Sequence, residues 1–384
     1  MKTDHIILGV SAACLVAMAG CQHGPGSTAV AEGEREGGRA PAIEVAMETE
    51  TGSGPGSVAS PGDVSRYESS VVRSAMRERA INVLADAALS DVALLRAHAL
   101  EGLSPAPQRA ETVARAAVED PNPGVRSVAA MVVGRLRLKS SAPLLRPLLS
   151  DPDQRVRAAA MYGMRINGLD IDMTPLARMV MERDPLVRRQ AALVLGELGE
   201  PSAAGLLDES LQRVPAVDSS QDRLVRLEVA NAMVKLGRRD AIHHIRAALY
   251  PQSAEGVEAA VFAALLLGEL NNRDSAKQLV EIVEQDVPRT ESYEKLTDPS
   301  HPYMYPPELR LAAAQGLAEM GFRDGRYVAD TYRGHADAGV RSQAARLFGS
   351  IGDASSLSRL DAMLADESVY VRVAAAAAVV DAVR

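Results

Sequence analysis

Apolar residues recur along most of the chain with the spacing of one face of an α-helix. Each of these segments begins with an apolar residue followed by arginine, and further apolar or small residues stand 4, 7, 8 and 11 positions later. One example is the set Val187, Ala191, Val194, Leu195 and Leu198. Residues at these separations share one side of a helix, so each segment predicts a helix with one buried stripe.

The spacing between these segments indicates an internal repeat. The apolar residues that start them are Leu95, Val125, Val156, Val187, Val225, Leu309, Val340 and Val371. Their successive separations are 30, 31, 31, 38, 84, 31 and 31 residues. The step of 84 residues contains a further, degenerate segment at 257–270, which makes about nine units. A period of this length is typical of stacked supersecondary units.

Each unit predicts two helices. Asp-Pro pairs at 120–121, 151–152 and 184–185 place a good N-cap residue before a proline at the first helical position. A small residue, usually alanine, recurs 4 positions after the starting residue, which favours close packing of neighbouring helices. Glycines 9 or 12 positions after the start are expected where helices end. A second helix then follows, as at 141–150 and 356–365.

These features resemble the HEAT-repeat family, in particular its short form of about 30 residues known from phycobilin lyases. The Asp-Pro start, the Val-Arg pair, the small residue and the Leu-Gly pair carry the resemblance, which covers roughly residues 66–384. It implies an all-α fold, an α-solenoid of about nine HEAT-like helix pairs with a long concave face.

The arginine after each starting residue could form a row of anion-binding sites. The family resemblance favours a structural ladder instead, in which each arginine pairs with an aspartate of an adjacent turn. The arginines are Arg96, Arg126, Arg157, Arg188, Arg226, Arg310, Arg341 and Arg372, and the aspartates are Asp120, Asp151, Asp184, Asp337 and Asp366. The degenerate unit has Glu258 or Ala260 in place of the arginine, so we expect a break in the ladder there.

The beginning of the chain predicts export and lipid anchoring. An apolar run at 6–19 is too short to span a bilayer and has the length of a secretory signal core. The sequence Met-Ala-Gly-Cys at 18–21 resembles the bacterial lipobox, which implies a signal peptide at 1–20 and a lipid on the Cys21 thiol. Glutamine at position 22 then favours the outer membrane over the inner one. Cys21 would be the only cysteine of the mature chain, so no internal disulfide is expected.

Residues 21–65 predict a flexible linker. Gly, Pro and Ser account for 18 of the 44 residues at 22–65, and few large apolar side chains offset the cost of ordering them. Seven acidic and two basic residues give the segment a net charge of −5 out of −8 for the chain. The repeat region is therefore nearly neutral, and we expect no nucleic-acid partner.

The sequence offers no catalytic constellation. No lysine follows a glycine, which excludes a P-loop, and neither G-x-G-x-x-G nor G-x-S-x-G occurs. No histidine precedes a glutamate, which excludes H-E-x-x-H zinc sites and the His-Glu pairs of deoxyhypusine hydroxylase, an iron-binding HEAT-repeat enzyme. We therefore predict no catalytic residue, no metal site and no cofactor.

An insertion at 286–308 interrupts the repeat. Two regular units would need 62 residues where the chain has 84, so about 22 are inserted, and the segment is rich in proline and tyrosine. Insertions in solenoids lie on the surface, and tyrosine is favoured at binding sites. The candidate partner-binding residues are Tyr293, His301, Tyr303 and Tyr305. The alternative is a loop that folds over the array and buries its own tyrosines.

The last segment, 371–383, is apolar nearly all round, and no further helix follows it. A terminal repeat normally needs a polar outer face, so the segment suggests end-to-end self-association or a docked partner.

These observations favour a non-enzymatic, membrane-anchored scaffold for protein–protein interactions in the cell envelope. The alternative is a phycobilin-lyase-like enzyme or chaperone that handles a protein-bound cofactor, and a third reading is a purely structural envelope protein.

Overall fold

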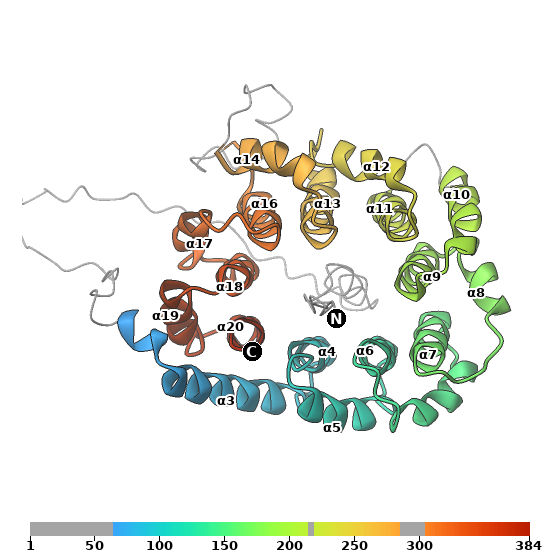
Figure 1. Ribbon diagram of the computed structural model, residues 1–384, viewed down its shortest axis with the longest axis horizontal. Helices are drawn as coiled ribbons and strands as arrows, with labels where there is room; N and C mark the ends of the chain where they lie inside the picture. Colours follow the sequence, from blue (N-terminus) through green and yellow to red (C-terminus); the bar gives the residue numbers. More distant parts are fainter. Residues whose placement is uncertain (1–63, 214–218, 285–303) are drawn as a thin grey trace, which may run out of the picture.

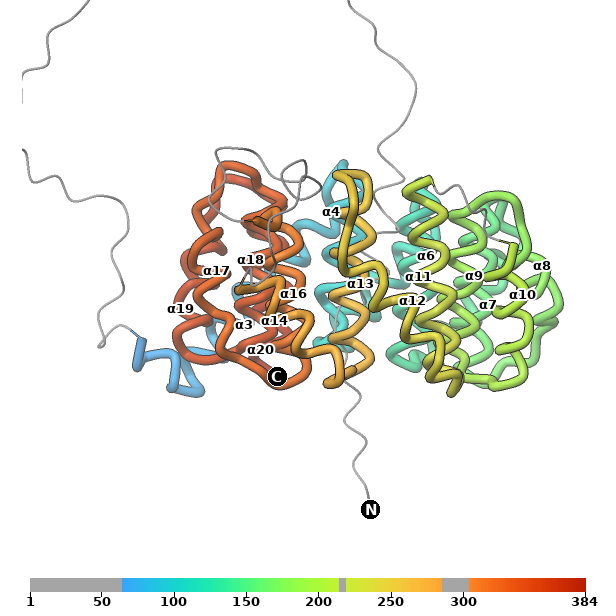
Figure 2. The backbone as a smooth tube through the Cα atoms, turned by 90° about the horizontal axis from the view of Figure 1, so that it is seen from above, coloured from blue at the N-terminus to red at the C-terminus, as the bar shows by residue number. Residues whose placement is uncertain are grey.

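The computed structural model describes residues 64–213, 219–284 and 304–384, and within them every regular element is a helix. The predicted all-α fold is thereby confirmed. The helices alternate between an inner and an outer layer along the chain (Figure 1). The inner helices are seen end-on in Figure 1 and lengthwise in Figure 2, so they run along the axis about which the layers curve. No helix in these ranges is long and apolar enough to cross a bilayer.

The inner layer consists of the helices that carry the repeated apolar-Arg segments. They are α4 (Ala93–Gly102), α6 (Pro123–Arg135), α7 (Gln154–Ile166), α9 (Pro185–Leu198), α11 (Ser220–Lys235), α13 (Val257–Glu269), α16 (Pro307–Glu319), α18 (Ala338–Ile351) and α20 (Val369–Ala382). Each packs on the next inner helix along the chain. The degenerate segment therefore forms a regular member of the layer, α13.

The outer layer has one helix before each inner helix, and apart from α3 these outer helices have at most 11 residues. They are α3 (Ser70–Ala87), α5 (Pro107–Ala117), the 3₁₀ helix η3 (Ala142–Ser150), α8 (Thr174–Met179), α10 (Ala204–Gln212), α12 (Ile242–Ala247), α14 (Ala276–Glu284), α17 (Arg326–Tyr332) and α19 (Ala354–Met363). Short 3₁₀ helices stand before α3, α10, α12, α13 and α14, namely η2 (Ser65–Glu68), η4 (Pro201–Ala203), η5 (Arg239–Ala241), η6 (Ala254–Gly256) and η7 (Arg273–Ser275).

Small residues set how closely the inner helices approach. The alanines 4 positions after the starting residues are fully buried, namely Ala99, Ala129, Ala160, Ala191, Ala313, Ala344 and Ala375. Glycines 12 positions after the start end their helices with positive φ, as Gly199 (69°) and Gly352 (67°) do. The glycines that stand 9 positions after the starting residue were also expected at helix ends, and for them the expectation is wrong. Gly196 lies inside α9, where a Cβ would be 2.9 Å from the Cα of Ala232 on α11.

The two ends of the helix array meet, so the solenoid closes into a ring (Figure 1). The last helix, α20, packs against α3 and α4, and η2 packs against α19. The apolar side chains of α20 are consequently buried, including Val371, Ala375 and Val379 at 0% exposure. The expectation of an uncovered apolar end is therefore wrong, because the first unit of the same chain covers it. The apolar surface from which end-to-end self-association was predicted is thus covered within the chain.

A polar cluster joins the two ends on the outside of the ring. Tyr67 of η2 is 1% exposed, and its hydroxyl donates a hydrogen bond of 2.7 Å to the carboxylate of Asp361 on α19. Arg79 of α3 forms an ion pair of 2.6 Å with the other oxygen of Asp361. The burial of Tyr67 and its hydrogen bond to Asp361 raise the pKa of the phenol.

We expect Tyr67→Phe to lower the free energy of unfolding by about 1–2 kcal/mol, because a charged acceptor loses a partly buried donor while the ring of Phe keeps the packing. Chemical denaturation of the purified chain measures this. Asp361→Asn in the Tyr67→Phe background should cost less than it does in the wild type, because the two side chains share one interaction. Additive costs would contradict a direct contribution of this hydrogen bond to closure.

Candidate functional site

The inner helices surround a cavity of about 700 Å³. Its wall is formed by residues of α4, α6, α7, α9, α13, α16, α18 and α20 and by residues just after these helices. The lining side chains that carry charge are Glu101, Arg135, Arg137, Glu197, Glu269, Glu319, Arg323, Arg346, Asp381 and Arg384. The cavity is thus lined by polar groups on a scaffold of alanine and glycine, and its volume is typical of a ligand site.

The wall residues follow from the repeat. Positions 3, 6 and 10 after each starting residue lie on one side of the helix, and this side faces the ring interior. His98 takes the first of these positions, Glu101 and Arg346 the second, and Glu197 and Glu319 the third. Sequence analysis missed this site, although the signal was present as polar residues that recur beside the apolar stripe.

An ion-pair bridge spans three neighbouring inner helices. The Lys235 Nζ of α11 lies 2.7 Å from a Glu197 oxygen on α9 and 2.6 Å from a Glu269 oxygen on α13. Burial works against the charged form of Lys235, but Glu269 and Glu197 outweigh it and raise the pKa of the ammonium group. Burial likewise opposes ionisation of Glu197, and Lys235 with Arg135 lowers the pKa of this carboxyl below its usual range. Glu197 is therefore charged, and both Glu197 and Glu269 are already paired with Lys235.

Two further glutamates of the inner helices have side-chain pKa values that burial raises to about 7. Burial raises the pKa of Glu319 to about 7, with Glu269 and Asp381 acting in the same direction, and Gln315 donates a hydrogen bond of 3.0 Å to its carboxyl. Burial also raises the pKa of Glu228 to about 7. Glu228 is 1% exposed, and its Oε1 accepts a 3.2 Å hydrogen bond from Asn231.

Arg346 on α18 and His98 on α4 both line the cavity, and they lie close enough for the charge of Arg346 to act on the imidazole. Arg346 lines the cavity, and its guanidinium makes no hydrogen bond or ion pair with any residue that the structure describes. Burial lowers the pKa of Arg346 to about 10, and the charge of Glu101 opposes this shift. Burial and the charge of Arg346 lower the pKa of His98 to about 4, so the imidazole is neutral at pH 7.

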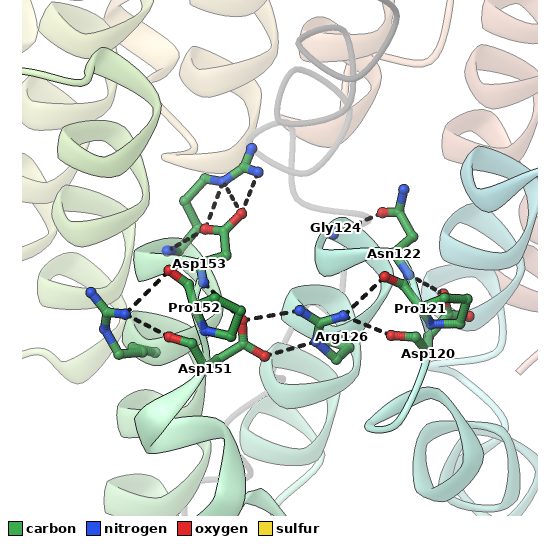
Figure 3. A network of polar contacts seen from close by, with 10 residues as sticks. Asp120, Pro121, Asn122, Gly124, Arg126, Asp151, Pro152 and Asp153 are labelled. Atoms are coloured by element: carbon green, nitrogen blue, oxygen red, sulfur yellow. Dashed lines mark hydrogen bonds and ion pairs between the residues drawn. The ribbon is translucent and has the colours of Figure 1, made fainter. Parts of the chain in front are cut away.

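The arginine–aspartate ladder lies at the N-terminal ends of the inner helices (Figure 3). Arg126 donates from Nε and Nη2 to the two oxygens of Asp151, at 2.8 and 3.0 Å, and from Nη1 to the carbonyl oxygens of Asp120 and Pro121. Two other pairs have the same two-pronged geometry, namely Arg96 with Asp120 and Arg341 with Asp366. The guanidinium groups of Arg96, Arg126 and Arg341 are thus engaged in contacts within the fold, as the predicted structural role requires.

The ladder departs from the expected pairs at several units. Arg157 and Arg372 donate only to backbone carbonyls of the preceding turn. Arg188 pairs with Asp222 at 2.9 Å. The structure shows no arginine pair for Asp184 and Asp337 among the described residues, and these carboxylates instead cap the first turns of α9 and α18.

Two other members of the row belong to the region around the degenerate unit. Arg310 is buried and donates to the Val283 carbonyl and to the Tyr332 hydroxyl at 2.9 Å. Arg226 lies on α11, and the next inner helix, α13, carries Glu258 or Ala260 where the other units carry arginine.

Of the predicted partner-binding residues of the insertion, the structure describes only Tyr305. Tyr293, His301 and Tyr303 lie outside the described residues, as does Cys21. Tyr305 is 0% exposed and belongs to the hydrophobic core just before α16. The prediction of a surface contact through Tyr305 is therefore wrong, because this ring lies in the hydrophobic core and is not accessible from outside. Across the described ranges, no three His, Cys, Asp or Glu side chains are grouped to hold a metal ion.

Comparison with known proteins supports the repeat assignment. The family described as HEAT repeats matches residues 110–179 and 305–380. A search of curated proteins finds no match. Among solved structures, human deoxyhypusine hydroxylase in complex with glycerol is similar at 15% identity and a TM-score of 0.33, over 82% of this chain and 97% of that one. The chain therefore contains HEAT repeats in two separate regions, within an all-helical fold of stacked helix pairs.

Proposed function

We propose that this protein is a membrane-anchored HEAT-repeat scaffold of the cell envelope, which binds a partner protein in the cavity of its ring. The observation that carries the proposal is the polar wall of this cavity. A ring built for stability alone gains most from apolar side chains that fill its interior, because buried polar groups without partners cost free energy. This ring instead keeps about 700 Å³ open and lines it with charged groups.

An unsatisfied polar atom in the cavity wall supports the interpretation that the cavity is kept open to bind a ligand. The Nε2 atom of His98, which lines the cavity, is buried and has no hydrogen-bond partner in the described ranges. Each such atom costs roughly 1–3 kcal/mol when it stays unsatisfied. Groups of this kind are expected where a ligand supplies the missing hydrogen bonds.

The lipobox-like sequence before Cys21 and the Gly/Pro/Ser-rich segment at 22–65 support the anchoring. Acylated Cys21 would hold the ring at the membrane, with the outer membrane favoured by Gln22. The linker gives the ring a reach of roughly 35–40 Å as an ideal coil. The ring can thus meet a partner within the envelope space without a membrane-spanning helix of its own.

Site-specific photo-crosslinking in the native membrane tests the binding surface. A benzoylphenylalanine in place of Gln315 stands in the cavity wall, and one in place of Gln108 stands on the exposed outer face of α5. We expect the first to capture one defined envelope protein and the second to leave it uncaptured. Equal capture at both positions, or none from the cavity, contradicts the proposal, and chromophore absorbance in the purified chain supports the lyase-like alternative.

Cys21→Ala tests the anchor. We expect the wild-type chain to incorporate labelled palmitate and to sediment with membranes, whereas Cys21→Ala incorporates none and moves to the soluble envelope fraction, because the only acylated residue is gone. Cys14→Ala is the matched control, since Cys14 lies within the predicted signal peptide. Labelled Cys21→Ala protein would contradict lipidation at this residue.

A further inference from the structure

The charges of the cavity wall do not cancel once their contacts are considered. Five arginines and five acidic residues line the cavity, so its formal charge is zero. Glu197 and Glu269 are both taken by Lys235, which is not itself part of the lining. Asp381 is paired with Arg384. Lys235 adds one positive charge to the two glutamates that it pairs with, and Glu319 is only partly ionised near pH 7, so the formal charge around the cavity is slightly positive.

Three arginines of the lining, in contrast, have no side-chain hydrogen-bond or ion-pair partner among the described residues. Arg346 inside the cavity makes no hydrogen bond or ion pair with the described parts of the chain. Arg137 and Arg323 line the mouth, are exposed, and likewise donate no side-chain hydrogen bond to residues that the structure describes. The available charge in the cavity is therefore positive, and the innermost part of it is Arg346.

Arg346 is placed to bind an anion. A guanidinium that is partly shielded from water is stabilised when an anion or several acceptors compensate its charge. Its side chain is only half-buried, so a ligand in the cavity can reach it. Its near neighbour His98 is neutral at pH 7 and cannot compete as a cation. The planar guanidinium fits a carboxylate with two parallel hydrogen bonds.

The rest of the wall suits a polypeptide. Tyr162, Ile166 and Leu265 offer apolar contact, the alanines of α20 leave room beside Arg346, and the amides of Asn271 and Gln315 can pair with a main chain. A site for a small inorganic anion needs none of these apolar contacts. The mixture of apolar surface, amides and free arginines matches an acidic segment whose aliphatic stems pack while its carboxylates are paired.

We propose that the ring cavity binds an acidic segment of the partner protein, with Arg346 holding a carboxylate inside and Arg137 and Arg323 attracting the segment at the mouth. This inference rests on the proposed function and names the chemistry of the partner. The acidic segment enters through the rim that carries Arg137 and Arg323, and its first buried carboxylate meets Arg346.

Titration calorimetry of the purified full chain tests the inference with two short peptides, one of alternating glutamate and alanine and one with glutamine for every glutamate. We expect binding of the glutamate peptide that weakens with added salt, and much weaker binding of the glutamine peptide. Arg346→Gln should weaken binding of the glutamate peptide roughly tenfold to a hundredfold, as the loss of a hydrogen-bonded charge pair does. Arg178→Gln, the same change on the exposed outer face of α8, should leave it unchanged.

The exposed pair Arg137→Gln with Arg323→Gln serves as a second test that does not depend on the folding of an interior variant. It should weaken binding and reduce its salt dependence. Three results would overturn the inference. The first is equal binding of both peptides, and the second is unchanged affinity in Arg346→Gln and in the double variant of Arg137 and Arg323. The third is displacement of the peptide by an equal concentration of inorganic phosphate. If cavity crosslinking at Gln315 still captures a partner in that case, the proposed function stands and only the acidic specificity fails.

Discussion

Gly102→Leu should open the ring. Gly102 ends α4, and a Cβ at this position would lie 2.8 Å from the Cβ of Ala377 on α20 and 3.1 Å from Leu84 of α3. Ala377 cannot turn aside, because its Cβ is fixed by the backbone of α20. A leucine therefore forces apart the helices that join the two ends, at a cost of about 1–3 kcal/mol or more. The remaining units keep their neighbours, so the helix content should persist.

Small-angle scattering measures the expected increase in radius of gyration, and hydrogen exchange should rise in α3, α4 and α20 while the opposite side of the ring stays protected. The opened variant exposes the apolar face of α20, so it should also self-associate. Gly205→Leu is the control, since a Cβ at Gly205 on α10 meets nothing within 4 Å. A Gly102→Leu protein with unchanged scattering and exchange would show that this contact does not hold the ring shut.

Glu228→Gln should stabilise the protein at about pH 8 by up to about 3 kcal/mol. Burial raises the pKa of Glu228 to about 7, against an ordinary value near 4.5. The folded state therefore holds a proton that the unfolded state has released, and stability declines as the pH rises from about 4.5 to about 7. A glutamine carries no charge at any of these values, so the variant avoids the penalty at high pH and resembles the wild type near pH 4.5.

Thermal or chemical denaturation across this pH range measures the difference between the two proteins. The gain should be absent near pH 4.5 and should level off above pH 7, because the wild-type carboxyl is then fully ionised in both states. Glu119→Gln, the same change at an exposed position, should change stability little at any pH. A Glu228→Gln variant that is less stable than the wild type at pH 8 would instead assign the charged carboxylate a role in holding the inner helices together.

Much of the fold could be predicted from local pattern. The apolar stripe, the Asp-Pro starts and the glycines at helix ends each concern residues within one turn or one helix, and their physics is local. The alanine 4 positions after each start predicted close helix packing for the same reason, since only a small side chain permits it at any curvature. The pairs of Arg126 with Asp151 and Arg341 with Asp366 also follow, because the repeat places the same groups at the same separation.

The candidate site could be predicted only in part. Polar residues at positions 3, 6 and 10 after each starting residue can be recognised in the sequence. Their role depends on which side chains lie opposite them in the ring. Arg346 on α18 gains its importance from His98 and Glu101 on α4, which are remote in sequence and close only because the ring closes. Tyr305 was misjudged for a related reason, since its composition suited a surface loop while its place beside α16 made it core.

The amino-acid sequence by itself determined the helix pairs, their number and the side of each helix that is buried, since these depend on residues within one unit and its neighbour. Only the tertiary structure decided that the array closes and that α20 is covered by α3 and α4. Curvature accumulates from small rotations between successive units, and each rotation depends on how particular side chains pack. The local pattern therefore specifies the helix pair that is repeated but not the total rotation along the array. Closure of the ring depends on this total rotation.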